Sequence, residues 1–240
     1  MEEGMLAAIG STPMVRLERL ASGGHAAVWV KMEAANPTGS YKDRMALAMI
    51  RGAERTGRLG PGQAVVEYTG GSTGVSLALV CAVKGHPLHI VSSDAFAREK
   101  LDHMRALGAQ LHIVESDSGG MTAKLTRDMI DAARVIAHET GAFWTDQLNN
   151  TDQLAAYHRM ADEIWRQTGG RLDGFVQSVG TAASLRGNAE RLRELATQPT
   201  FAASSRSRSP LPRSDAAVPT LCTKPSRRPP VCRQISSAMR

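Results

Sequence analysis

The chain lacks the features that mark secreted, membrane-spanning and metal-binding proteins. No apolar run follows a basic N-terminus and no stretch of about eighteen apolar residues occurs, so we expect neither a signal peptide nor a membrane span. Only three of the 240 residues are cysteine, and their odd number and irregular spacing fit a reducing compartment. The seven histidines show no zinc-site spacing. We therefore expect a cytoplasmic protein without a bound metal.

Acidic residues are scarce at the C-terminal end, and this is where the net charge of +6 arises. Residues 196–240 hold eight of the 29 lysines and arginines but one of the 23 acidic residues, which leaves 21 basic and 22 acidic residues elsewhere. The rest of the chain is therefore close to neutral. A basic arm that binds nucleic acid is one interpretation, but the segment lacks the interleaved aromatic residues or regular spacing of such an arm.

Short β-branched runs alternate with amphipathic segments from about residue 64 onward, which is typical of βαβ units around a parallel sheet. The predicted strands comprise residues 27–32, 64–68, 88–92, 110–114, 142–145 and 174–179. The predicted helices comprise residues 41–56, 74–84, 97–107, 120–139, 152–168 and 184–195. The pattern predicts an α/β fold, and the apolar content of 42% allows a sizeable core.

A lysine follows a Gly-Ser turn in the stretch Asn36-Pro37-Thr38-Gly39-Ser40-Tyr41-Lys42-Asp43-Arg44. Ser40 is a suitable N-cap, and the run that follows Arg44 is rich in strong helix formers. Lys42 should then lie in the first helical turn, where the helix dipole and Arg44 favour the neutral amine that attacks an aldehyde. A lone Gly-Ser-x-Lys would indicate a surface lysine, but the full nine-residue stretch is far more specific.

This stretch resembles the cofactor-lysine segment, Asn-Pro-x-Gly-Ser-x-Lys-Asp-Arg, of the fold-type-II pyridoxal-phosphate enzymes of the cysteine synthase and cystathionine β-synthase family. The segment from Ile9 to Leu17 resembles the family's Gly-x-Thr-Pro-hydrophobic segment. The resemblance covers about residues 9 to 195. It implies that Lys42 binds pyridoxal 5'-phosphate covalently.

A second stretch, Thr69-Gly70-Gly71-Ser72-Thr73-Gly74, follows a buried-type strand and opens a helix. Amides and hydroxyls that converge on a helix N-terminus bind anions, although such a loop on its own can be only a turn. The stretch resembles the family's Thr-Ser-Gly-Asn-Thr-Gly. The resemblance implies that residues 69–73 bind the substrate α-carboxylate. Ser72 takes the asparagine position beside the cofactor's phenolic oxygen, which leaves substrate choice and reaction type open.

Two later loops complete the resemblance. Gly180-Thr181-Ala182-Ala183-Ser184 resembles the phosphate-binding Gly-Thr-Gly-Gly-Thr, with alanine at two glycine positions, so any of these that needs a positive φ would be strained. No Gly-x-Gly-x-x-Gly dinucleotide pattern occurs there. Asp146-Gln147-Leu148-Asn149-Asn150 resembles Asp-Gln-Phe-x-Asn, which implies that Gln147 grips the substrate carboxylate. Without the other segments, each loop would be interpreted as a simple turn.

The resemblance implies two three-layer αβα domains with open, mostly parallel sheets, as in the tryptophan synthase β-subunit-like fold, the second of them truncated. We expect a smaller domain at residues 35–145 that carries Lys42 and the substrate loop. Residues 1–34 and 146–195 would form an incomplete larger domain with the phosphate loop. Family members are commonly homodimers, so a homodimer is possible in principle, while membrane and nucleic-acid partners are not expected.

The activity that the resemblance implies is β-replacement on an activated serine, with O-acetylserine and sulfide giving cysteine. Lys42 would hold the cofactor and then act as general base on the substrate Cα proton. The Asp-Gln loop favours the cysteine synthase and cystathionine β-synthase branch over the threonine dehydratases, and leaves the nucleophile and leaving group open. The alternatives are another β-eliminating or β-replacing member such as cystathionine β-synthase, and a catalytically inactive remnant.

Residues 196–240 do not continue the family pattern. They contain seven of the eleven prolines, are rich in serine and arginine, and have Phe201 as their one aromatic residue. Such a segment cannot bury a core of its own, so we expect disorder. We attribute the abrupt change to a reading-frame shift or an aberrant terminus. An intact frame at the resequenced locus, with no family-like continuation in another frame, would contradict this hypothesis.

Overall fold

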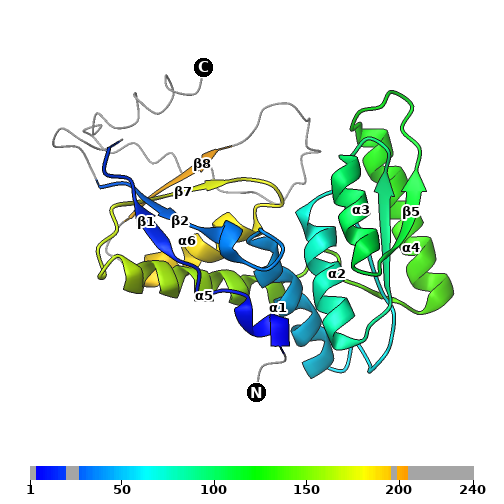
Figure 1. Cartoon of the computed structure of the whole chain (residues 1–240), viewed down its shortest axis with the longest axis horizontal. Helices are drawn as coiled ribbons and strands as arrows, with labels where there is room; N and C mark the ends of the chain where they lie inside the picture. Colours follow the sequence, from blue (N-terminus) through cyan, green and yellow to red (C-terminus); the bar gives the residue numbers. More distant parts are fainter. Residues whose placement is uncertain (1–3, 20–26, 196–198, 205–240) are drawn as a thin grey trace.

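The chain forms an α/β structure in the computed structural model, which describes residues 4–19, 27–195 and 199–204 (Figure 1). The sheet with the most strands is parallel, with the order β5-β4-β3-β6. Its strands are β3 (Val65–Tyr68), β4 (Leu88–Ser93), β5 (Gln110–Val114) and β6 (Phe143–Trp144). The α/β class predicted from the sequence is therefore confirmed.

Helices cover both faces of this sheet because alternate strand residues point to opposite sides. One face packs Val65, Leu88 and Ile90 against α2 (Ser72–Lys84) and α3 (Arg98–Ala106). The other face packs Val66 and Val91, among others, against α4 (Ala123–Thr140). The central strands β3 and β4 are buried on both sides, as expected for a parallel sheet, whereas β5 at the edge of the sheet is largely exposed.

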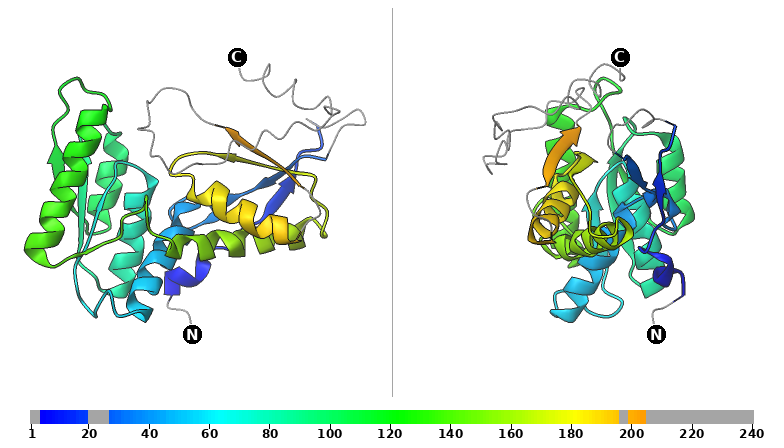
Figure 2. Two further views of the ribbon diagram at one scale, coloured as in Figure 1. Left: turned by 180° about the vertical axis from the view of Figure 1, so that it is seen from behind. Right: turned by 90° about the vertical axis from the view of Figure 1, so that its left-hand side faces the viewer.

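The remaining elements form a second part of the molecule beside this sheet (Figure 2). Two short sheets belong to it: antiparallel β1 (Met14–Arg16) and β2 (Trp29–Lys31), and parallel β7 (Gly174–Ser178) and β8 (Thr200–Ser204). Its helices are η1 (Gly4–Ala8), η2 (Glu33–Ala35), α1 (Lys42–Arg55), α5 (Asp152–Gln167) and α6 (Ala183–Leu195). Helix α5 packs against both α1 and α6, while α1 also packs against α2 of the first part.

Every predicted strand and helix is present, with ends that differ by at most three residues. The prediction that residues 196–240 are disordered is wrong for Thr200–Ser204, because β8 pairs in parallel with β7. Phe201 packs edge-on against Phe175 and under the Arg193 guanidinium, which gives this strand an anchor. The rest of the predicted tail, apart from Pro199, lies outside the described residues. The predicted domain boundaries stay a prediction.

The register of the parallel sheet brings two loops together. Val66 lies opposite Trp144, so β3 and β6 end at the same edge, and the loops that begin at Thr69 and Thr145 start side by side. Open parallel sheets bind ligands at this carboxyl edge. Within the described part of the chain, no helix is long and apolar enough to cross a membrane, and no group of three or more His, Cys, Asp or Glu side chains is arranged to hold a metal.

Candidate active site

The lysine turn ends at the first residue of α1. Lys42 is the first helical residue and Tyr41 is the N-cap, so the prediction that Ser40 is the N-cap is off by one position. The Ser40 hydroxyl nevertheless accepts a hydrogen bond from the Lys42 backbone N–H at 3.2 Å. Gly39 has φ +76°, a conformation that glycine adopts without strain. The turn therefore delivers Lys42 to the helix start as the sequence predicts.

Asp43 holds this turn against the neighbouring helix. Its fully buried carboxylate accepts hydrogen bonds from the Thr38 backbone N–H at 2.8 Å, from the Thr38 hydroxyl, and from the Ser76 hydroxyl of α2 at 2.5 Å. Hydrogen bonds to a charged group are the stronger kind. Asp43 thereby fixes the start of α1 next to the start of α2, which lie side by side in Figure 1.

Arg44 is buried and belongs to an ion cluster whose other members are partly buried. Its guanidinium contacts Glu33 at 2.7 Å and Glu163 at 2.8 Å, and Lys31 also contacts Glu163 at 2.7 Å. Burial alone would raise the pKa of Glu163, but the hydrogen bonds from Arg44 and Lys31 outweigh it and hold that pKa at about 2. The positive charges of Arg44 and Lys31 are balanced by the negative charges of Glu33 and Glu163. The charge of Arg44 is therefore neutralised by its own partners.

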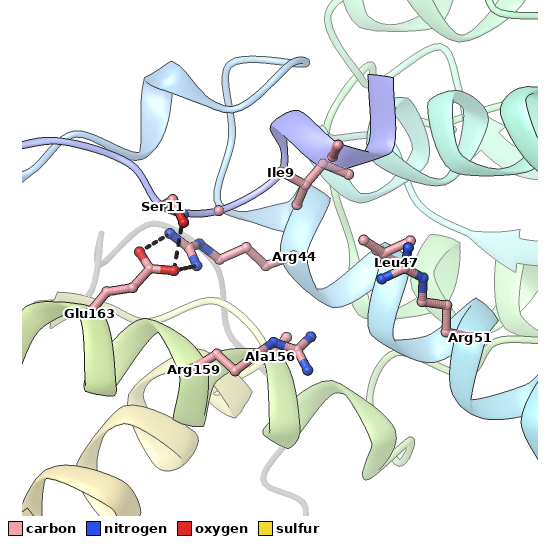
Figure 3. A pocket seen from close by; sticks show the side chains of 10 residues that line it. Ile9, Ser11, Arg44, Leu47, Arg51, Ala156, Arg159 and Glu163 are labelled. Atoms are coloured by element: carbon pink, nitrogen blue, oxygen red, sulfur yellow. Dashed lines mark hydrogen bonds and ion pairs between the residues drawn. The ribbon is translucent and has the colours of Figure 1, made fainter. Parts of the chain in front are cut away.

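Figure 3 shows Arg44 and Glu163 at the wall of a cavity of about 310 Å³ between η1, α1 and α5. Ile9, Leu47 and Ala156 also line it. The lining contains Arg44 but none of the residues proposed to bind cofactor or substrate. This cavity is therefore separate from the candidate active site. That site consists of four segments: the lysine turn and residues 69–74, 146–150 and 180–184.

Lys42 is partly exposed as a residue, but its amine is largely shielded from water in weakly polar surroundings. Its Nζ lies 3.3 Å from the Met45 sulfur and 5.2 Å from the centre of the Tyr41 ring. Burial lowers the pKa of Lys42 to about 8, while the Glu67 carboxyl acts in the opposite direction. The sequence predicted a neutral amine but assigned it partly to Arg44. Burial is the cause instead, since the charge of Arg44 is balanced by its own partners.

Residues 69–74 connect β3 to α2 as predicted, although the helix already begins at Ser72. The backbone N–H groups of Ser72 and Thr73 are thus in the first helical turn, where they have no intrahelical acceptor and can bind an anion. Gly70 is required by packing, because a Cβ there would lie 1.8 Å from the Phe96 ring. The Gly71 N–H is held by the Thr69 hydroxyl at 3.2 Å.

Gln147 follows β6 and reaches this same loop. Its side-chain oxygen accepts a hydrogen bond from the Thr73 hydroxyl at 2.8 Å, and its side-chain nitrogen donates to the Tyr68 carbonyl at 3.2 Å. The structure therefore brings the two predicted substrate segments together. The preceding residue, Asp146, has φ +44°, a left-handed conformation that is costly outside glycine and is often found at functional sites.

The predicted phosphate loop connects β7 to α6, which starts at Ala183. Ala182 has a positive φ of +64°. The sequence predicts strain at any alanine of this loop with a positive φ, and Ala182 is such a residue. A Cβ at Gly180 would meet no atom within 4 Å, so the loop faces open space there. Burial raises the pKa of the Tyr41 phenol, a rise that its hydrogen bond with Ser184 partly offsets.

Three contacts therefore join the predicted segments around the start of α1. Hydrogen bonds join Asp43 of the lysine turn to α2 and Thr73 of α2 to Gln147, while Ser184 of the phosphate loop lies near enough to Tyr41 to influence its pKa. A shielded amine with a lowered pKa and two helix starts suited to anions match the aldehyde, phosphate and carboxylate groups that pyridoxal phosphate and an amino acid carry. The residues present fit that cofactor.

The sequence analysis missed Glu67, Tyr41 and the acidic members of the Arg44 cluster. Glu67 is fully buried in β3, and its carboxyl contacts Thr145 and Gln147. A signal for it was present, because a lone acidic residue interrupts the apolar run of a doubly covered strand. Glu33 and Glu163 gave no such signal. Their common partner Arg44 is 11 residues from Glu33 and 119 residues from Glu163, so no local pattern links the three.

Comparison with known proteins agrees with this arrangement. The chain is 40% identical over 187 residues to cysteine synthase B of Salmonella typhimurium and to that of Escherichia coli, an alignment that covers 78% of this chain and 60% of each relative. A crystal structure of O-ureido-L-serine synthase superposes with a TM-score of 0.77 at 34% identity, covering 85% of this chain and 63% of that one. Cysteine synthase from Entamoeba histolytica gives 0.77 at 32% identity, covering 85% and 60%.

The chain spans about 60% of the length of these curated relatives. A family model described as pyridoxal-phosphate dependent enzyme matches residues 5–238, which is nearly the whole chain. The chain belongs to the family of pyridoxal-phosphate dependent enzymes.

Proposed function

We propose that this chain binds pyridoxal 5'-phosphate through Lys42 and serves β-replacement on an activated serine, as in the cysteine synthases that it resembles. The observation that carries the proposal is the shielded Lys42 amine, whose pKa of about 8 leaves roughly a tenth of it neutral at pH 7 and about half of it neutral at pH 8, far more than for an ordinary lysine. A neutral amine is the form that attacks the cofactor aldehyde. The surrounding loops supply the two anion sites that the cofactor and substrate require.

In this proposal Lys42 has two tasks. Its neutral amine would hold the cofactor through the cofactor's aldehyde group, and the Lys42 nitrogen would act as the base for the proton on the substrate Cα. The cofactor ring, when bound, supplies the electron sink that makes this proton acidic. The low polarity around Nζ, with Met45 sulfur at 3.3 Å, helps to keep the amine neutral and ready to accept a proton.

The two anion sites would orient the reactants. The first-turn amides at Ser72 and Thr73, with Thr69 and the glycines between, would bind the substrate carboxylate, and Gln147 would add its side-chain amide. The Gln147 side-chain nitrogen already donates one N–H to the Tyr68 carbonyl, so its second N–H would donate to the substrate carboxylate.

Residues Gly180, Thr181, Ala182, Ala183 and Ser184 would bind the cofactor phosphate at the start of α6. The strained Ala182 is expected to weaken that binding relative to a glycine.

The substrates proposed are O-acetylserine and sulfide, and the proposed setting is a cytoplasmic homodimer. The name of the Salmonella typhimurium relative, cysteine synthase B, supports this substrate choice. Ser72 stands where the family pattern has an asparagine, so other β-replacing nucleophiles such as those used by cystathionine β-synthase are the natural second substrate set to assay.

A cofactor-binding measurement tests the proposal. The purified full chain is mixed with pyridoxal phosphate, and the absorbance band of lysine-bound cofactor is recorded, followed by cysteine formation from O-acetylserine and sulfide. Lys42→Ala should lose the band, whereas Lys124→Ala, at an exposed position of α4, should keep it. A band that survives in Lys42→Ala contradicts the assignment. A stable Lys42 band without cysteine formation would identify a cofactor-binding chain that is catalytically silent.

A further inference from the structure

Glu67 is a fully buried carboxylate that the proposed chemistry does not use. It lies in β3, and its carboxyl accepts hydrogen bonds from three donors: the Thr145 hydroxyl at 2.6 Å, the Gln147 backbone N–H at 3.0 Å and the Tyr68 backbone N–H at 2.9 Å. Thr145 and Gln147 lie 78 and 80 residues further along the chain. One side chain therefore ties the end of β3 to the loop that follows β6.

These bonds determine where the Gln147 side chain can lie. Glu67 fixes the Gln147 main chain, and the hydroxyl of Thr73 and the carbonyl of Tyr68 then hold its amide group. Asp146, directly before Gln147, has a left-handed φ of +44°, so this part of the loop is strained. A strained backbone persists only where its surroundings hold it, and the two bonds from Glu67 flank this position on either side.

A buried carboxylate is an expensive way to join two strands. Moving a charge out of water costs several kcal/mol, and apolar side chains of similar volume are often equally or more stabilising in a core. The carboxylate also sits at the carboxyl edge of the sheet, and it influences Lys42 electrostatically. These observations favour a role in the site over a purely structural one.

We propose that Glu67 is a positioning residue for recognition of the substrate α-carboxylate: by holding the Thr145 hydroxyl and the Gln147 amide, it sets Gln147 against the Thr69–Thr73 loop. The ligand class is an α-amino acid linked to the cofactor. This inference rests on the proposed function, because it assumes that the loop binds a carboxylate. Glu67 itself touches neither substrate nor cofactor in this scheme and acts through Gln147.

Two stable ligands separate this role from a structural one. N-(5'-phosphopyridoxyl)-L-serine carries the phosphate, the ring and the carboxylate, whereas N-(5'-phosphopyridoxyl)ethanolamine lacks only the carboxylate. Both are preformed amines, so their binding needs no bond to Lys42. The dissociation constants of the two ligands are measured by calorimetry on the full chain and on Glu67→Gln, at a pH well above the Glu67 pKa of about 7 so that the carboxylate is ionised.

Glutamine has the shape of Glu67, but its NH₂ group faces a donor and cannot accept a hydrogen bond. The wild-type chain should bind the serine ligand more tightly than the ethanolamine ligand. In Glu67→Gln, this preference should fall at least about tenfold, the factor for one lost hydrogen bond to a charged group, while affinity for the ethanolamine ligand stays within about twofold.

Glu139→Gln, at an exposed position of α4, is the matched control and should keep the wild-type preference. Where Glu67→Gln fails to fold, Thr145→Val removes a single donor from the carboxylate and should reduce the preference by a smaller factor. An equal loss for both ligands, an unchanged preference, or no preference in the wild-type chain overturns the inference. The proposed function is judged separately, by the lysine-bound cofactor band.

Discussion

The stability of this protein should fall as the pH rises from about 5 to 7, because of Glu67. Burial raises the pKa of this carboxyl from 4.5 to about 7, against the opposing effect of its three hydrogen bonds and with a further rise from Asp146. In the unfolded chain the carboxyl is expected to ionise at its ordinary value. Between the two values the folded state binds a proton that the unfolded state has released, so raising the pH favours unfolding.

The magnitude follows from the two pKa values. A difference of about 2.5 units multiplied by 1.36 kcal/mol gives about 3 kcal/mol, all of it present below pH 4.5 and lost by pH 7. Such a loss is a large share of the stability of an ordinary domain. Glu163, with a pKa of about 2, and Lys42, with a pKa of about 8, act outside this window. The lowered pKa of His89 acts inside it with the opposite sign, so the Glu67 contribution is taken from the difference between the wild-type chain and Glu67→Gln.

Urea unfolding of the wild-type chain and of Glu67→Gln between pH 5 and pH 8 provides the measurement. The glutamine cannot ionise, so the variant should show a flatter dependence of the unfolding free energy on pH, by about 3 kcal/mol over the window. A constant offset between the two curves would report only the lost hydrogen bond. Parallel curves for the two proteins would refute the reasoning, because they would mean that Glu67 titrates alike in the folded and unfolded chains.

Three further changes have defined outcomes. Ala182→Gly should relieve the strain of the left-handed backbone and raise the unfolding free energy by about 1 kcal/mol, measured by urea titration. The variant should also bind pyridoxal phosphate more tightly. Weaker binding would contradict the strain argument. Gly70→Ala should destabilise by about 1–3 kcal/mol because its Cβ meets the Phe96 ring, and Phe96→Ala in the same chain should recover part of that loss in thermal unfolding. Arg44→Met should cost about 3–5 kcal/mol, measured by urea unfolding, since it leaves buried carboxylates without their main partner; a change below 1 kcal/mol would show that the cluster is not coupled.

The sequence predicted the elements well because their signals are local. The strands of the parallel sheet are β-branched runs bounded by turn residues, and a glycine with positive φ follows α2 and α4, at Gly85 and Gly141. The two missed strands gave no such signal. Strand β1 has three residues, too few to show a period, and β8 lies in a segment whose proline and serine content argues against order.

The site was predictable as a set of segments but not as a set of contacts. Short motifs predicted the local positions of Lys42 at a helix start, of the Thr69–Gly74 loop before α2 and of Gln147 after β6, since each motif includes its own turn residues. Their roles in cofactor and substrate binding stay predictions. The partner of Arg44 at Glu163 is 119 residues away, and the Glu67 contacts cross about 80 residues. Pairings at such separation depend on how the strands are ordered, which no local pattern specifies.

These contacts change what the lysine motif means. Of its last three residues, only Lys42 presents a reactive group, while Asp43 binds the turn and α2, and Arg44 binds η2 and α5. The motif therefore describes a scaffold that places one amine, and the amine owes its lowered pKa to burial by that scaffold. A variant that loosens the Asp43 contacts should admit water and raise the pKa of Lys42 even though the lysine is untouched. The lowered pKa of Lys42 is thus a property of packing, and a match to the motif without that burial would not be sufficient for the proposed chemistry.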